Sequence, residues 1–180
     1  MTALMNVIQE RRSIRKYEDK AVPDDFLRQI LQSVRWAPSW ANTQCWEVVV
    51  VRNSDTKDKL QACLGPRNPS TKAITQAPLV LALCGKEKHS GFYKGEAGTK
   101  FGDWLMFDLG LATQNICLTA HSLGLGTVIV GLFDHNKAKD VLGVGTGYEL
   151  VVLIPIGFPA KESPAPKRRE IEEFVHEEKF

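Results

Sequence analysis

The sequence predicts a single domain, spanning residues 1–180, in which α-helices and β-strands are mixed. First, three segments of strand length are strongly apolar, at 46–51, 79–84 and 148–156. Second, apolar side chains recur at helical spacing from Phe26 to Val34 and again from Trp104 to Leu123. Third, 180 residues with 43% hydrophobic and 24% charged side chains suit one globular unit.

The N-terminal half is expected to contain, in order, a short helix at 5–12, a helix from Val22 to Val34, a polar loop at 39–44, a strand at 46–51, a short helix from Ser54 or Asp55 to Leu64, and a loop at 65–70. Pro23 and the acids after it suit a first helical turn. The second helix should end before Pro38, because a residue preceding proline avoids the helical region. The strand at 46–51 is nearly continuous in its apolar character, which predicts a strand covered on both faces.

The C-terminal half is expected to contain a buried strand at 79–84, a mobile, glycine-rich excursion at 86–100, a long helix from Trp104 to Leu123, an apolar run at 128–131, a helix from Asp134 to Gly143, a strand at 148–156, and a tail with basic and then apolar residues. Gly124 is a natural left-handed cap for the long helix. That helix has no continuous polar face, so we expect it at the centre of the fold or in an interface. The apolar residues of the tail predict that it docks on its own core or on a partner.

Charge and composition exclude several classes of function. The net charge of +2 is too small to favour a nucleic-acid partner. No apolar run is long enough to span a bilayer, and we expect a cytoplasmic protein with no membrane partner. The four cysteines (45, 63, 84 and 117) and the four histidines are scattered along the chain, without metal-ligand spacing. We therefore expect reduced, mostly buried thiols and no metal site.

The segment from Arg11 to Tyr17 contains four cations in seven residues around a serine. If it is extended, Arg11, Ser13, Arg15 and Tyr17 share one face, while Arg12 and Lys16 lie on the other. Arg11 and Arg15 would then be about 13 Å apart, at roughly 3.3 Å per residue. Such a span could let one end bind a phosphate, for which arginine is well suited. Taken alone, the segment fits a solvated basic turn better.

Three later blocks change this interpretation. They are Ala37-Pro38-Ser39 with Asn42-Thr43-Gln44-Cys45-Trp46, then Gly124-Leu125-Gly126-Thr127 through Gly131, and then Lys167-Arg168-Arg169 with residues 171–176. Together with Arg11–Tyr17, and in this order, they resemble the FMN-dependent nitroreductase family. The resemblance implies an α+β, three-layer fold with a central, mostly antiparallel sheet flanked by helices. It also implies an intertwined homodimer in which both chains bind each FMN at the interface.

The resemblance further implies which residues bind FMN. The set is Arg11, Arg12, Ser13, Arg15, Pro38, Ser39, Trp40, Asn42, Asn68, Asp108, Val130, Gly131, Lys167 and Arg169. Arg11, Ser13 and Arg169 resemble phosphate ligands, with Lys167 nearby. Arg15 resembles the cation beside the N1 and C2-carbonyl edge of the flavin, where it would favour the reduced form.

The remaining roles follow in the same way. Pro38, Ser39 and Trp40, with Asn42, would reach the ring from the partner chain. Asn68 would serve the ribityl chain and Asp108 the pyrimidine edge, and the backbone at 130–131 would approach flavin N5. Three alternatives stay open: Asp108 pairs with a lysine, Trp40 packs only in the interface, and the arginines form surface salt bridges. Cys45 replaces the proline usual in the family.

The implied activity is NAD(P)H-dependent reduction of nitroaromatic or quinone acceptors by a ping-pong cycle. FMN carries the chemistry, so no catalytic side chain is expected. NADH or NADPH should visit as a diffusing co-substrate, because no GxGxxG motif follows a strand. Two alternatives are a specialised flavoenzyme on the same scaffold (a dehydrogenase or a reductive dehalogenase) and a flavin-binding or sensing module without turnover.

Overall fold

The computed structural model describes residues 2–161 and 163–180 of the chain. Its centre is a four-stranded sheet of order β1-β2-β6-β5, and every neighbouring pair of strands is antiparallel. The four strands are β1 (Trp46–Val51), β2 (Leu79–Lys86), β5 (Gly126–Thr127) and β6 (Tyr148–Gly157). A separate hairpin pairs β3 (Phe92–Tyr93) with β4 (Glu96–Ala97).

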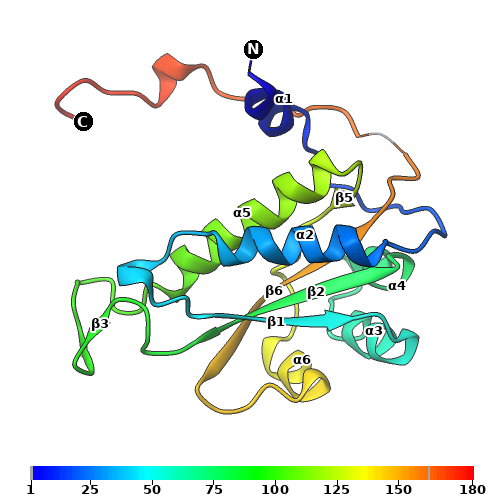
Figure 1. Cartoon of the computed structure of the whole chain (residues 1–180), viewed down its shortest axis with the longest axis horizontal. Coiled ribbons are helices and arrows are strands. Elements are labelled where there is room, and N and C mark those ends of the chain that lie inside the picture. Colours follow the sequence, from blue (N-terminus) through cyan, green and yellow to red (C-terminus); the bar gives the residue numbers. More distant parts are fainter. Residues whose placement is uncertain (1, 162) are drawn as a thin grey trace.

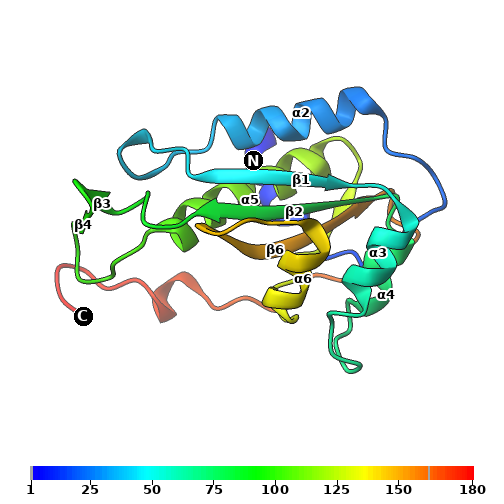
Figure 2. The same cartoon turned by 90° about the horizontal axis from the view of Figure 1, so that it is seen from below.

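Helices cover both faces of the sheet (Figures 1 and 2). The helices are α1 (Ala3–Glu10), α2 (Asp24–Arg35), α3 (Ser54–Gln61), α4 (Thr71–Gln76), α5 (Leu105–Ser122) and α6 (His135–Leu142), with short 3₁₀ turns η1 (Trp40–Asn42) and η2 (Ile171–Glu173). Helices α2 and α5 pack on one face, and α3, α4 and α6 pack on the other. This confirms the predicted three-layer α+β fold with an antiparallel sheet.

Alternation along β2 builds the two cores. Leu79, Leu81 and Leu83 join the cluster under α2 and α5, whereas the alternate residues Val80 and Ala82 join the cluster under the other helices. Successive side chains of a strand point to opposite faces, so one fully buried strand supplies both cores. β2 is therefore covered on both faces.

Several predicted boundaries are confirmed. α2 begins after Pro23 with two acids in its first turn and ends before Pro38. The long helix ends as expected at Gly124, whose φ of 76° is left-handed. Asp134 caps α6 by accepting a hydrogen bond from the Lys137 N–H at 3.0 Å, and Gly143 ends that helix with φ 66°.

Other predictions are corrected. β1 lies at the edge of the sheet and its residues are mostly half-exposed or exposed, so the prediction that this strand is covered on both faces is wrong. Helix α3 is capped by Asn53, whose side chain accepts a hydrogen bond from the Thr56 N–H at 2.9 Å, and not by Ser54 or Asp55. This helix ends at Gln61. Helix α4 was missed. The excursion at 86–100 contains the β3–β4 hairpin, which the sequence did not predict.

The C-terminal tail does not dock on its own core. It runs past α1 and away from the sheet (Figure 1), and its apolar side chains are exposed, among them Ile171, Phe174 and Val175. The prediction of docking on the same chain is therefore wrong, and docking on a partner stays a prediction. Among the residues that the structure describes, no helix combines the length and the apolar character that crossing a bilayer requires.

Candidate functional site

The basic segment is extended and is held by β5. Helix α1 ends at Arg11, whose N–H still donates to the Val7 carbonyl at 3.1 Å. Beyond it, Ser13 forms a parallel bridge with Thr127, and the Ile14 N–H donates to the Thr127 carbonyl at 2.8 Å. The backbone is therefore pinned at the centre of the segment, between the two ends that carry the predicted arginine ligands.

Strict alternation fails at two positions. Tyr17 is buried, and its hydroxyl donates to the carbonyls of Ile14 and Pro155, at 2.7 and 3.1 Å. It therefore belongs to the core and does not share a face with the exposed Arg15. Arg12, expected on the opposite face, lines the same hollow as Arg11, and it donates to the Gln9 and Arg11 carbonyls at the end of α1.

A hollow of about 590 Å³ brings together Arg11 and Ser13, two of the predicted phosphate ligands. It is lined by Arg11, Arg12, Ser13, Arg15, Ser163, Pro164, Pro166 and Arg168. Its four guanidinium groups and two hydroxyls form a strongly cationic cradle, and none of the described residues that line it carries a carboxylate. Guanidinium groups bind phosphate oxygens in pairs, and a hydroxyl adds a further donor. This donor set fits a phosphate monoester.

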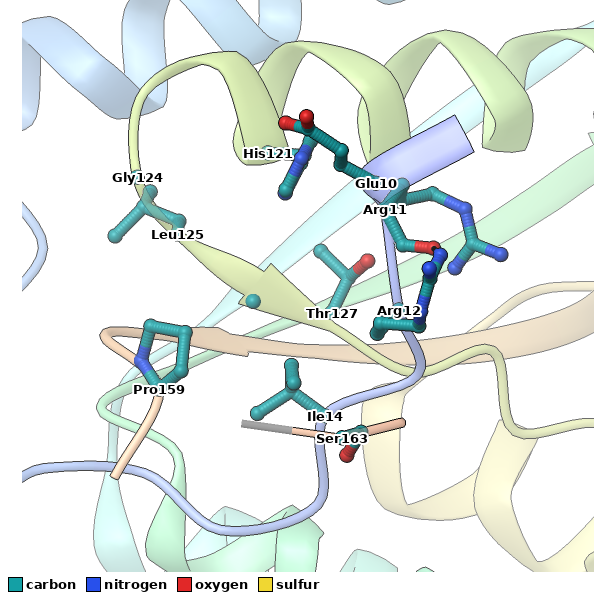
Figure 3. Close-up of a pocket in the computed structure, with 11 residues that line it drawn as sticks. Glu10, Arg11, Arg12, Ile14, His121, Gly124, Leu125, Thr127, Pro159 and Ser163 are labelled. Atoms are coloured by element: carbon teal, nitrogen blue, oxygen red, sulfur yellow. Dashed lines mark hydrogen bonds between the residues drawn. The ribbon is translucent and has the colours of Figure 1, made fainter. Parts of the chain in front are cut away.

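A second hollow, of about 430 Å³, adjoins the first because Arg11 and Arg12 line both (Figure 3). It lies between the C-terminal ends of α1 and α5 and strand β5. Glu10 and His121 line it from these two helix ends. Burial lowers the pKa of His121, an effect that the nearby charge of Glu10 opposes. Glu10 makes this side of the basic segment less suited to an anion.

The loop at 65–70 joins Arg15 to the segment after β5. The Arg15 Nε donates to the buried Ser70 hydroxyl at 3.2 Å. The Ser70 N–H donates to the Asn68 Oδ1 at 2.9 Å, and the Asn68 Nδ2 donates to the Leu132 carbonyl at 2.8 Å. The structure therefore links two predicted site residues, Arg15 and Asn68, to the segment that follows Gly131.

Val130 and Gly131 lie at the edge of the sheet. Val130 exchanges two backbone hydrogen bonds with Leu153, each of 2.9 Å, which fix its position. Gly131 is exposed, and a Cβ built on it would meet only the Val152 Cγ1, at 4.0 Å. The packing of the chain itself therefore does not require a glycine here; the Gly131 carbonyl lies 3.1 Å from the His135 Nε2, and the missing side chain allows a ligand to approach the backbone closely.

The loop at 38–45 lies elsewhere. It follows α2 and sits beside the β3–β4 hairpin, at the end of the molecule opposite α3 and α4 (Figures 1 and 2). Pro38, Ser39, Trp40 and Asn42 do not line the basic hollow. One chain therefore does not bring the two groups of predicted FMN ligands together.

Asp108 does not pair with a lysine. Its carboxylate is only 1% exposed and accepts hydrogen bonds from the Ser90 hydroxyl at 2.6 Å and from the Trp40 N–H at 3.1 Å. The Cys45 thiol lies 3.6 Å from it. The open alternative of a lysine partner is therefore wrong, and the carboxylate is committed to groups of its own chain.

The tail contributes a different arginine from those expected. Arg168 lines the basic hollow. Lys167 is exposed and does not line it, and Arg169 bonds the Glu173 carbonyl and faces the Phe174 ring at 5.7 Å. The structure thus brings Arg168, which the resemblance did not single out, to the same hollow as Arg11, and phosphate roles for Lys167 and Arg169 stay predictions. Sequence reasoning also missed Ser70 and Ser90, which carry no motif.

Comparisons with known proteins identify the family of the chain. A model of the nitroreductase family matches residues 8–73 and 65–158. A provisionally named NADH dehydrogenase/NAD(P)H nitroreductase of Methanothermobacter thermautotrophicus is 31% identical over 98% of this chain and 87% of its own length. The iodotyrosine deiodinase of Hydra vulgaris is 23% identical, over 92% of this chain and 69% of its own.

Among solved structures, an FMN-dependent nitroreductase of Clostridium difficile superposes with a TM-score of 0.82. It is 25% identical to this chain, and the match covers 98% of this chain and 99% of the other. The matched fold runs through the basic segment, the loop at 38–45 and the segment after β5. With a family model matching most of its length and a relative above 30% identity, the chain belongs to the nitroreductase family of oxidoreductases.

Proposed function

We propose that this chain is an FMN-dependent oxidoreductase that takes electrons from NADH or NADPH and passes them to a nitroaromatic or quinone acceptor in a ping-pong cycle. The observation that carries the proposal is the cationic hollow around Arg11, Ser13 and Arg15. The chain that forms this hollow belongs to the nitroreductase family, and an FMN-dependent nitroreductase has the same fold.

The phosphate of FMN would lie in this hollow. Arg11, Arg12 and Arg168 supply guanidinium donors, and Ser13 is held at its edge by the bridge to Thr127. A charge-assisted hydrogen bond is about twice as strong as a neutral one, so these side chains would contribute most of the affinity.

The ring would lie towards Arg15, Asn68 and the backbone of Gly131. Arg15 is oriented by Ser70, so its charge is held in place before a ligand arrives. When bound, FMN supplies the electron transfer between donor and acceptor. A fixed guanidinium beside the edge that gains negative charge on reduction would raise the flavin's reduction potential.

We propose that two copies of the chain form the complete site. Apolar side chains are exposed on α1 (Leu4 and Ile8), on α5 (Met106 and Phe107) and along the tail. Large exposed apolar patches are typical of protein interfaces. In such a homodimer, the loop at 38–45 of one copy would lie against the flavin of the other, which explains why one chain leaves these residues apart from the hollow.

The test is to purify the protein with its native flavin. We expect about one FMN per chain, a dimer by light scattering, and bleaching of the flavin by NADH, NADPH or both under anaerobic conditions. Adding a nitroaromatic or a quinone should then restore the oxidised spectrum with repeated turnover. A protein that binds no FMN would overturn the cofactor proposal. A bound flavin that neither nicotinamide bleaches would overturn the activity, and would leave a flavin-binding module.

Reductive dehalogenation is the second candidate, supported by the likeness to iodotyrosine deiodinase over 92% of this chain. The same reduced protein can be offered a halogenated tyrosine. Halide release at a rate above that of any nitro or quinone acceptor would favour this candidate. Reoxidation of the flavin only by nitro and quinone compounds would reject it.

A further inference from the structure

Asp108 joins two segments that are distant in sequence. It lies in the first turn of α5, yet its hydrogen-bond donors come from outside that helix. The backbone N–H of Trp40 donates to the two carboxylate oxygens, at 3.1 and 3.2 Å, and the Ser90 hydroxyl donates at 2.6 Å. The Cys45 thiol lies 3.6 Å away. A buried carboxylate needs several hydrogen-bond donors, and here the loop at 38–45 and the excursion supply them.

The loop that Asp108 holds is strained. Ala41, Asn42 and Gln44 have φ values of 43°, 57° and 49°. Residues other than glycine rarely adopt this left-handed backbone conformation, and such strain persists only when the surrounding structure imposes it. The Ser39 hydroxyl accepts from the Gln44 N–H at 2.9 Å, which closes the loop on itself. Asp108 is the attachment that ties this closed loop to α5.

The excursion is attached at the same point. Ser90 is fully buried, and its carbonyl accepts from the Trp104 N–H at 3.1 Å. The Trp104 ring in turn packs against the Trp40 ring, with centroids 5.1 Å apart and planes inclined by 43°. Gly91, with φ 81°, leaves no room for a side chain beside Trp104, since a Cβ would lie 2.5 Å from its Cδ1. The loop and the excursion thus form one unit around Asp108.

We propose that Asp108 is a positioning residue. It fixes the loop at 38–45 and the excursion relative to each other, and together these two segments form one wall of the acceptor site. This rests on the proposed function, in which the loop reaches the flavin of the other copy. Asp108 acts through Trp40 and Ser90 and is not a flavin ligand. The carboxylate fixes where the Trp40 indole lies, and through Ser90 it fixes the aromatic residues of the excursion that face the same end of the molecule.

The first experiment reads the position of the loop without activity. Two indoles about 5 Å apart couple their electronic transitions, which gives a paired circular-dichroism signal. Trp40→Phe assigns that signal. We expect Asp108→Ala to abolish it and Ser90→Ala to weaken it, while Asp108→Asn, which keeps the shape and one acceptor oxygen, retains part of it. The matched control is Asn115→Ala. It also removes a side-chain hydrogen bond of α5, in this case from the Asn115 Nδ2 to the Ser33 carbonyl.

The second experiment is kinetic and uses the FMN-loaded protein. Asp108→Ala should raise the KM for the acceptor about tenfold, because a displaced wall loses contacts that bind the acceptor equally in the ground state and the transition state. Its kcat should change less, and both constants are measured at saturating FMN, because the loop at 38–45 also lies against the proposed flavin. Asn115→Ala should leave the acceptor KM unchanged, and Asp108→Asn should recover part of the Asp108→Ala defect.

The outcomes separate the two proposals. If Asp108→Ala behaves like Asn115→Ala in both the dichroism and the KM, Asp108 is only structural and the inference fails. If Asp108→Ala does not fold, Ser90→Ala and Asp108→Asn decide in the same way. If neither the wild-type protein nor any variant binds FMN, the proposed function fails. The circular-dichroism signal still shows whether Asp108 positions the loop.

Discussion

Arg15 and Ser70 are joined by a hydrogen bond of 3.2 Å although 55 residues separate them. Ser70 is 4% exposed, so its hydroxyl is fixed, and it orients a guanidinium that is otherwise exposed. Through Asn68 the same loop holds the Leu132 carbonyl. The contact therefore couples the basic segment to the backbone on which the flavin ring is proposed to lie, and it gives Arg15 a role different from that of Arg11.

Arg11→Ala and Arg15→Ala should differ in kind. Arg11→Ala should weaken FMN binding about tenfold or more, since a hydrogen bond to a charged group is worth about 1.5–3 kcal/mol, and should leave the potential of the remaining bound flavin unchanged. Arg15→Ala should also lower the reduction potential, because the charge near the ring edge is lost. Equal losses of affinity with an unchanged potential in Arg15→Ala would make Arg15 another phosphate contact. Spectroelectrochemical titration of bound flavin checks both.

Gly126→Ala should damage the site without touching a ligand. A Cβ at Gly126 would lie 2.5 Å from the Ile14 Cγ1 and 2.6 Å from its Cβ, and Ile14 sits between Ser13 and Arg15. The extra methyl must shift the basic segment, so we expect weaker FMN binding and a loss of about 1–3 kcal/mol in the free energy of unfolding. Gly145→Ala is the control, because nothing lies within 4 Å of its Cβ. Similar FMN affinities in the two variants would contradict the prediction.

Arg168, and not Arg169, should be the tail residue that contributes to flavin retention. Arg168 lines the basic hollow, whereas Arg169 is tied to Glu173 within its own turn. Arg168→Ala should therefore raise the Kd for FMN about tenfold, and Arg169→Ala should raise it less. Fluorescence titration of each apo-protein with FMN measures the difference. The opposite order would show that the assignment by family resemblance holds and that the tail rearranges on binding.

The Cys45 thiol should be unreactive in the native protein and should make stability fall at high pH. Burial, with the charge of Asp108, raises its pKa from the ordinary 9.0 to about 12. Between these values the folded chain keeps a proton that the unfolded chain releases, so the free energy of unfolding declines as pH rises from 9 to about 12. Urea titrations across this range should show a shallower decline for Cys45→Ala. An equal decline in the two proteins, or rapid labelling of native Cys45, would refute this.

The sequence predicts those features that depend on neighbours along the chain. Pro23 and Gly124 set helix ends through their own backbone preferences, so their positions could be predicted. Features that depend on distant partners could not. Tyr17 departs from simple alternation because its hydroxyl finds the Pro155 carbonyl on β6. The Arg15–Ser70 bond joins two stretches whose separate motifs give no sign of each other.

Asp108 shows the same limit at the site. Its place on the long helix was predictable, and the resemblance implied a flavin contact for it, but its observed donors come from segments 68 and 18 residues away in the sequence. The tail shows it for the fold. Its apolar residues predicted docking, yet they are exposed in the single chain, and nothing local in the sequence distinguishes docking on the same chain from docking on a second copy.

The most direct test compares the binding of FMN with that of riboflavin, which lacks the phosphate. The account predicts that wild-type apo-protein binds FMN at least about a hundredfold more tightly, as two or more charge-assisted hydrogen bonds would give. That preference should largely disappear in Arg11→Ala combined with Ser13→Ala. Equal affinities for FMN and riboflavin in the wild-type protein, or a preference that survives in the double variant, would contradict the assignment of this segment as the phosphate site.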